Sequence, residues 1–184
     1  MTGWTICVAC MQRLHGFQMA RNRQVKVELT LFFHFFPEQA EAETRTVTLR
    51  GHPVLPDDEY ALIEAFCPDP QCDCRRVMIN VAGRRQMERG FLASIGFGFD
   101  RAGQFAGPFL DPLNPQSQYA DALLDLVTQV LADPVYVARL EAHYRQVKQA
   151  VAAAPQPANR LGAQSNGNTE ARSARRSRRK RRRK

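Results

Sequence analysis

Three of the five cysteines lie within eight residues, and their types and spacing predict a specific chemistry. Cys67, Cys72 and Cys74 follow the pattern C-x4-C-x-C. Thiolates are common zinc ligands in structural sites, where four ligands surround the ion as a tetrahedron. Pro68 and Pro70 stiffen the segment between the first two cysteines, which lowers the entropy lost when a site closes. The spacing therefore predicts a structural zinc site in a turn.

A tetrahedral site needs one ligand more than this cluster supplies. Our first choice within the chain is His52, because it lies in the loop leading into a helix that we expect to end at Cys67. The alternatives are His34, Asp73, a residue of a second subunit, or a cysteine of the Cys7-Val8-Ala9-Cys10 pair. An iron–sulfur cluster would also want four cysteines, and the spacing matches neither ferredoxin pattern.

Two other interpretations of the cluster stay open. Arg75 and Arg76 follow it directly, and nearby cations favour the thiolate, so one cysteine could be the reactive thiol of an enzyme or redox protein. Alternatively, Cys67 packs in the core and the other two are reduced thiols without a ligand. The sequence contains no H-E-x-x-H, G-x-S-x-G or P-loop motif, so no reaction is indicated. We therefore expect a binding protein rather than an enzyme.

Hydrophobic periodicity predicts the elements that position the cluster. Alternation of apolar and polar residues predicts four strands, at 24–36, 44–50, 76–81 and 91–99, the first two forming a hairpin around an acidic turn at 38–43. The alternation in the last strand leaves one face with only Ser94, Gly96 and Gly98, so we expect a backbone or helix to approach it closely.

Helical spacing and start signals predict three helices. The first runs from Pro56 to Cys67, the second begins at Asn114-Pro115, and the third begins at Asp133-Pro134. In the third helix, the expected apolar seam consists of Val137, Leu140, Tyr144, Val147 and Val151. His143 then falls on the outer face, where we expect it in solvent. The order ββαββαα predicts an α+β domain with a mainly antiparallel sheet and a C-terminal antiparallel helix pair packed on it.

Charge divides the chain into a nearly neutral body and a basic tail. Residues 1–154 carry 15 Lys and Arg against 17 Asp and Glu, whereas residues 155–184 carry 11 against one. Ten of the basic residues lie in 172–184, where like charges cannot bury a core. We expect a loose N-terminal extension at 1–23, a single α+β domain at 24–151, and a disordered basic tail at 152–184. The tail predicts weak contact with nucleic acid or another polyanion.

The expected compartment is inferred from the lack of a recognisable membrane span or secretory signal in the sequence. The longest stretch without a charged residue is 1–12, shorter than the roughly 20 apolar residues of a membrane span. The apolar residues of this stretch have no basic residue in front of them, which argues against a secretory signal. We therefore expect the protein in the cytoplasm, where thiols stay reduced and metal binding is favoured over disulfides. We expect translation to start at Met19, with residues 1–18 contributing little to stability.

The stretch YALIEAFCPDPQCDCRRV at 60–77 resembles a family of uncharacterised bacterial proteins, and the similarity continues through 107–115 to about residue 150. Some members of that family end in a SEC-C motif, a small zinc module also found at the end of the preprotein translocase ATPase. This chain has no cysteine after Cys74, and its arginine tail stands in that place. The resemblance implies that the cysteine cluster is a family feature. It implies no SEC-C zinc site, no role in secretion and no enzymatic activity for this chain.

Overall fold

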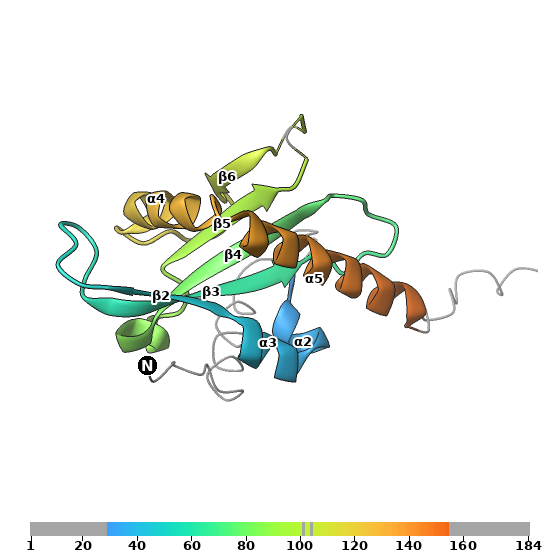
Figure 1. Cartoon of the computed structure of the whole chain (residues 1–184), viewed down its shortest axis with the longest axis horizontal. Coiled ribbons are helices and arrows are strands. Elements are labelled where there is room, and N and C mark those ends of the chain that lie inside the picture. Colours follow the sequence, from blue (N-terminus) through green and yellow to red (C-terminus); the bar gives the residue numbers. More distant parts are fainter. Residues whose placement is uncertain (1–28, 101, 104, 155–184) are drawn as a thin grey trace, which may run out of the picture. The chain divides into compact units, whose positions relative to one another are not determined.

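An antiparallel sheet forms the centre of the computed structural model, which describes residues 29–100, 102–103 and 105–154 (Figure 1). Its strands are β1 (Thr30–Leu31), β2 (Arg45–Leu49), β3 (Asp58–Phe66), β4 (Arg76–Gly83), β5 (Ala93–Gly98) and β6 (Gly107–Leu110). They are ordered β1-β3-β4-β5-β6. Strands β1 and β2 share the outer edge of β3: β1 pairs with its C-terminal end and β2 with its N-terminal half. Every strand pair is antiparallel, so the predicted sheet type is confirmed.

Three short helices lie between strands of the sheet in sequence, and two longer helices follow the last strand. They are α2 (Phe32–Phe35), α3 (Pro37–Glu43), a 3-10 helix (Arg84–Arg89), α4 (Ala120–Val130) and α5 (Pro134–Ala153). Helix α4 packs on β5 and β6, whereas α5 contacts α2 and β4 and crosses the sheet in Figure 1. The predicted α+β class with C-terminal helices is therefore confirmed. None of the helices in the described ranges is long and apolar enough to span a bilayer.

The predicted helix from Pro56 to Cys67 is wrong, because most of this segment is strand β3. All residues from Tyr60 to Cys67 are buried, so β3 is covered on both faces. Such a strand reads as a nearly continuous apolar run without alternation, which periodicity alone does not distinguish from a buried helix. Pro68 and Pro70 begin the turn from β3 into β4.

The first predicted hairpin is also wrong in its described part. After the short strand β1, the chain enters α2 and then α3, which occupies the acidic segment that we expected to be a turn. Pro37 takes the first helical position of α3, where its missing N–H costs no hydrogen bond. Strand β2 pairs with β3 instead of with the preceding strand. Residues 24–28 of the predicted strand lie outside the described residues.

The strands predicted at 44–50, 76–81 and 91–99 are present as β2, β4 and β5. The face of β5 that carries Ser94, Gly96 and Gly98 is approached closely at its two glycines, as we expected. The ring of Phe109 on β6 lies against Gly96, and the carbonyl of Phe105 lies against Gly98. Helix α5 begins at Pro134 as predicted, but α4 begins at Ala120 with Tyr119 as its N-cap, so the predicted start at Asn114-Pro115 is wrong.

Two boundaries of the predicted domain division remain predictions. The N-terminal extension at 1–23 and almost all of the tail at 152–184 lie outside the described residues. Within the described part, α5 continues to Ala153, two residues beyond the domain end that we expected.

Candidate metal centre

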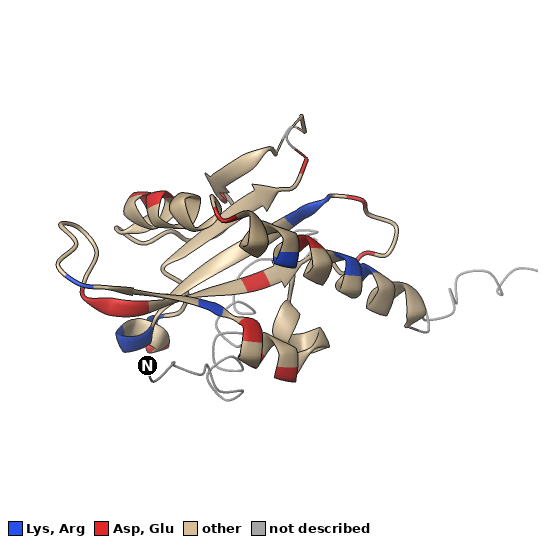
Figure 2. Ribbon diagram, in the orientation of Figure 1, with Lys and Arg blue, Asp and Glu red and all other residues tan. Residues whose placement is uncertain are grey.

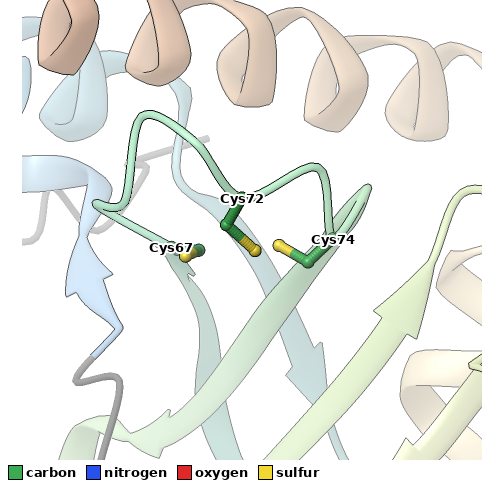
Figure 3. Close-up of side chains that lie close together, drawn as sticks. All are labelled: Cys67, Cys72 and Cys74. Carbon is green, nitrogen blue, oxygen red and sulfur yellow. The ribbon is translucent and has the colours of Figure 1, made fainter.

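The turn between β3 and β4 brings the three clustered cysteines together. Cys67 follows the last residue of β3, Cys72 lies in the loop, and Cys74 stands two residues before β4. Their sulfur atoms all lie within 4.8 Å of one another, and Figure 3 shows the side chains of Cys72 and Cys74 pointing toward each other. Zinc–sulfur bonds of about 2.3 Å in a tetrahedron imply sulfur separations of about 4 Å, so a small contraction would fit the ion.

Local hydrogen bonds explain why this loop reverses. Asp69 accepts the N–H of Gln71 on its side chain at 2.9 Å and the N–H of Cys72 on its carbonyl at 3.3 Å. This Asx turn follows directly from the Pro-Asp-Pro sequence. At the end of the loop, Arg75 adopts a positive φ of 44°, and its carbonyl accepts the N–H of Phe99 at 2.9 Å. The loop is thereby joined to the end of β5.

Side chains of helix α5 hold the cysteine loop mainly through hydrogen bonds to the loop backbone, and none of these bonds involves a thiol. Lys148 Nζ donates to the carbonyl oxygens of Asp69 at 2.8 Å and Cys72 at 2.6 Å. The hydroxyl of Tyr144 donates to Asp73 Oδ1 at 3.2 Å and accepts the N–H of Arg75 at 3.4 Å. Asp73 is therefore turned toward α5 and is not brought to the sulfurs.

The environment of Cys74 favours the neutral thiol when no ion is bound. Burial, together with the neighbouring charges of Cys72 and Cys67, raises the pKa of Cys74 to about 11, and Lys148 offsets this only in part. A pKa in this range leaves almost no thiolate at neutral pH, whereas reactive cysteines have lowered values. The arrangement thus lacks the activation that a nucleophilic Cys74 would need.

His52, our first choice for the fourth ligand, is not brought to the cysteines. It is exposed in the loop before β3, and its Nδ1 atom accepts the N–H groups of Val54 at 3.2 Å and Leu55 at 2.9 Å. The nine residues of β3 separate this loop from Cys67, a distance of roughly 30 Å at about 3.3 Å per residue. His52 was chosen because a helix was expected there, and the strand carries it to the far end. His34 is exposed on α2 and is likewise outside the group.

A second polar cluster was missed in the sequence, and it centres on His143. The expectation that His143 is solvated on the outer face of its helix is wrong, because the residue is only 2% exposed. The buried side chains of α5 are Tyr136, Leu140, His143 and Val147, spaced four, three and four residues apart. The predicted seam had used Val137 and Tyr144, one residue further along. Glu64, a carboxylate inside an otherwise apolar run, was the available signal that a polar partner would be needed.

Both ring nitrogens of His143 contact carboxylates. Nδ1 lies 2.7 Å from Oε2 of Glu64 on β3, and Nε2 lies 2.7 Å from Oε2 of Glu43 on α3. The ring stacks on Phe32 with centroids 4.1 Å apart and planes inclined by 12°. Because the two carboxylates contact opposite sides of the ring, they cannot converge with one ring nitrogen on a single ion. This cluster is therefore a charge-paired link between elements and not a second metal site.

The charged residues of the body are mixed in sign. Figure 2 shows acidic and basic residues interspersed along the described helices and strands. This agrees with the near balance of 15 basic and 17 acidic residues over positions 1–154.

No protein-family model, curated protein or solved structure matches the chain. The interpretation of the site therefore depends on its own geometry, and the three converging cysteines are its strongest feature.

Proposed function

We propose that this chain is a non-enzymatic binding protein in which Cys67, Cys72 and Cys74 hold a structural zinc ion. The observation that carries the proposal is the convergence of three sulfur atoms within 4.8 Å at the end of two adjacent central strands. An ion at this point ties the end of β3 to the beginning of β4. It would stabilise the register of the strand pair from which the rest of the sheet extends.

The donor set supports zinc over the common hard cations. Thiolates select soft or borderline metals such as zinc and copper(I), whereas magnesium and calcium prefer oxygen ligands. Zinc has no redox chemistry, which suits a purely structural role at this turn. A reducing compartment such as the cytoplasm keeps the cysteines available for metal. If the resemblance of residues 60–77 to a bacterial family holds, the same site would be a family feature.

Elemental analysis of the purified full chain tests the proposal. We expect about one zinc per chain in the wild type and a large loss in Cys72→Ser. The matched control is Gln71→Ser, which changes the neighbouring exposed residue and leaves the backbone hydrogen bond to Asp69 in place. Wild-type protein that neither contains nor takes up zinc, or a Cys72→Ser variant that retains it, contradicts the proposal.

Alkylation kinetics separate the structural site from a reactive thiol. Zinc-bound thiolates should react slowly with iodoacetamide and faster after a chelator removes the ion. A thiol that reacts rapidly in the metal-loaded protein, together with activity that disappears in Cys72→Ser, would favour the alternative of an enzyme or redox protein.

The basic segment 172–184 supplies the binding part of the proposal. Its ten Lys and Arg residues contrast with a body of mixed charge, so contact with nucleic acid or another polyanion belongs to this segment. No aromatic residue lies among its arginines, which favours phosphate contact over base stacking.

A further inference from the structure

We propose that Cys67, Cys72 and Cys74 also form a binding site for trivalent arsenic or antimony, in which the three sulfur atoms complete the coordination of the ion. This inference goes beyond the proposed function, because it rests on the same cysteine triad but requires neither zinc nor a fourth ligand. The ligand class is the hydroxide of a trivalent thiophilic metalloid, and arsenite is the representative that serves as the probe below.

The number of converging donors matches a trivalent metalloid better than a divalent metal. A closed structural zinc site has four protein ligands in a tetrahedron. Over residues 29–100, 102–103 and 105–154, only the three cysteines converge, and the acidic residue within their loop, Asp73, is turned toward Tyr144. Trivalent arsenic takes three thiolates as a pyramid and carries a lone pair of electrons at the fourth position. The triad by itself is therefore a complete donor set for arsenic(III), whereas for zinc it leaves one position open.

The loop holds the three sulfur atoms close together before any ion binds. All three lie within 4.8 Å of one another, and the side chains of Cys72 and Cys74 point toward each other (Figure 3). The turn at Asp69 and the hydrogen bonds from Lys148 to the loop carbonyls fix this arrangement. After one sulfur has bonded to the ion, the second and third bonds form within the same loop at a high effective concentration. Little ordering entropy is lost in forming them.

The thiols are available to an incoming ion in a definite order. Cys72 and Cys74 are partly exposed, whereas Cys67 is only 2% exposed. The hydrogen bonds from Lys148 and Tyr144 go to loop backbone atoms and to Asp73, so they do not occupy the sulfurs. An ion arriving from solvent therefore meets Cys72 and Cys74 first and bonds to Cys67 last.

The binding reaction is an exchange of ligands on arsenic and is balanced without a further reactant. Arsenous acid, As(OH)3, exchanges its three hydroxides for three thiols. In each step an As–O bond breaks, an As–S bond forms, and the thiol proton leaves with the hydroxide as water. Arsenic stays in oxidation state +3, so no oxidant or reductant is needed. Where zinc occupies the triad, it leaves as the free ion and the hydroxides leave unprotonated.

Net charge favours arsenic(III) over copper(I), a soft ion that thiolates also bind tightly. Arsenic(III) cancels the charges of three thiolates, whereas copper(I) would leave two negative charges beside Cys67, which is almost fully buried. A buried charge without a partner is costly. The ammonium group of Lys148, held on the carbonyls of Asp69 and Cys72, balances one such charge. The neutral arsenic complex needs no balancing charge.

Arsenic K-edge X-ray absorption of the reduced full-length chain, mixed with an equimolar amount of arsenite, counts the bonds directly. We expect three sulfur neighbours and no oxygen, and an intact mass raised by one arsenic atom less three hydrogens. Titration of the chain's five thiols should show three of them protected. This count is made on the wild type, so it does not depend on the folding of a variant.

Variants locate the bound arsenic. In Cys72→Ser, oxygen should replace one sulfur neighbour, and arsenite affinity should fall by more than the roughly 10- to 100-fold that loss of an outer-shell partner costs a metal site. Gln71→Ser, at the exposed neighbouring position, is the matched control and should behave as the wild type. The double variant Cys7→Ser/Cys10→Ser retains only the triad and should keep all three sulfur neighbours.

The outcomes separate this inference from the proposed function. A wild type that binds zinc but never shows three sulfur neighbours around arsenic overturns the inference and leaves the zinc site standing. Three sulfur neighbours in a protein that does not bind zinc support the inference and overturn the proposed zinc site. Loss of a sulfur neighbour in Cys7→Ser/Cys10→Ser assigns the arsenic to other cysteines and overturns the inference. A wild type that binds neither zinc nor arsenite overturns both.

Discussion

The Nδ1 atom of His143 lies 2.7 Å from Oε2 of Glu64, and this contact joins helix α5 to the central strand β3. The other ring nitrogen contacts Glu43 on α3 at the same distance. One buried imidazole thus connects three elements that are far apart in sequence. When protonated, its charge is balanced by carboxylates on both sides, which is the condition under which a buried charge is tolerated.

The stability of the protein should depend on pH through this network. Burial alone lowers the pKa of His143, but hydrogen bonds and charges from Glu64 and then Glu43 outweigh burial and raise the pKa above 6.5. Its contribution to the free energy of unfolding is therefore complete below pH 6.5 and disappears as the pH rises through the raised folded-state pKa. For Glu43, burial alone raises the pKa, but the hydrogen bond to His143 and the nearby charges lower it below 4.5. Its contribution is present above pH 4.5 and disappears as the pH falls through the lowered value.

Urea unfolding of the wild type and His143→Gln across this pH range measures the effect. The difference between the two should be largest between about pH 4.5 and 6.5 and should shrink on both sides. Glu141→Gln, which affects only the exposed pair with Arg145, should give a small and nearly constant difference. An NMR titration of the His143 ring in the wild type provides a check independent of variant folding. A ring pKa at or below 6.5 would contradict the prediction.

The two carboxylates should differ in their importance. The side chain of Glu64 is 5% exposed and that of Glu43 is 37% exposed. Glu64→Gln removes a charge from a buried pair, so we expect a loss of about 3 kcal/mol in the free energy of unfolding. Glu43→Gln should cost about 1 kcal/mol or less, because water already screens that pair. Chemical denaturation of both variants at pH 6 makes the comparison, and equal losses would show that burial does not control the pair.

The tether between Lys148 and the cysteine loop should support metal binding. Lys148→Met removes two hydrogen bonds from Nζ to the loop carbonyls while retaining most of the apolar stem. We expect faster amide exchange in residues 69–74 and a zinc affinity lower by about tenfold, since one charged hydrogen bond contributes about 1.5 kcal/mol or more. Gln149→Met, at the exposed neighbouring position, is the control. Unchanged exchange and affinity in Lys148→Met would show that the loop is held by its own turn.

The contact between β5 and the loop before β6 predicts different costs for two glycine substitutions. A Cβ on Gly98 would collide with the backbone carbonyl of Phe105, so Gly98→Ala requires a backbone shift at this end of the sheet. Gly107 has a positive φ of 76° but open space around it, so Gly107→Ala should cost only about 1–2 kcal/mol of backbone strain. We expect Gly98→Ala to lower the melting temperature more than Gly107→Ala does. The reverse order would mean that this loop adapts at little cost.

Sequence patterns predicted the strands in which apolar and polar residues alternate clearly. They failed for the strand that is buried on both faces, because such a strand has no alternation. Strand β5 alternates large side chains with glycine and serine, so its type and its close approach to a neighbouring backbone could both be predicted. Strand β3 is buried on both faces, and its apolar run fitted a helix equally well. The choice of His52 depended on the same error, although even the expected helix from Pro56 to Cys67 would have kept its start about 18 Å from Cys67.

The two polar clusters differed in how well local sequence indicated them. The cysteine triad lies within one turn, so its convergence could be predicted from spacing alone. The His143 cluster joins residues 79 and 100 positions apart, and its geometry depends on how α5 is rotated about its axis. A shift of one residue, about 100° around a helix, decides whether position 143 or 144 faces the sheet. Both candidate seams contain enough apolar residues, so periodicity could not choose between them.

The basic segment 172–184 should account for binding to polyanions. Deleting it removes ten positive charges and leaves a body with a nearly balanced and spatially mixed charge. We expect the wild type to bind single-stranded DNA and polyphosphate weakly, with an affinity that falls steeply with salt, because each neutralised phosphate releases counterions. The deleted chain should lose most of this binding and keep its melting temperature and zinc content. A variant with the residues of 172–184 in shuffled order should bind as the wild type does, because the interaction depends on charge and not on sequence. Salt-dependent fluorescence anisotropy measures all three proteins, and tight binding by the deleted chain would assign the interaction to the folded body instead.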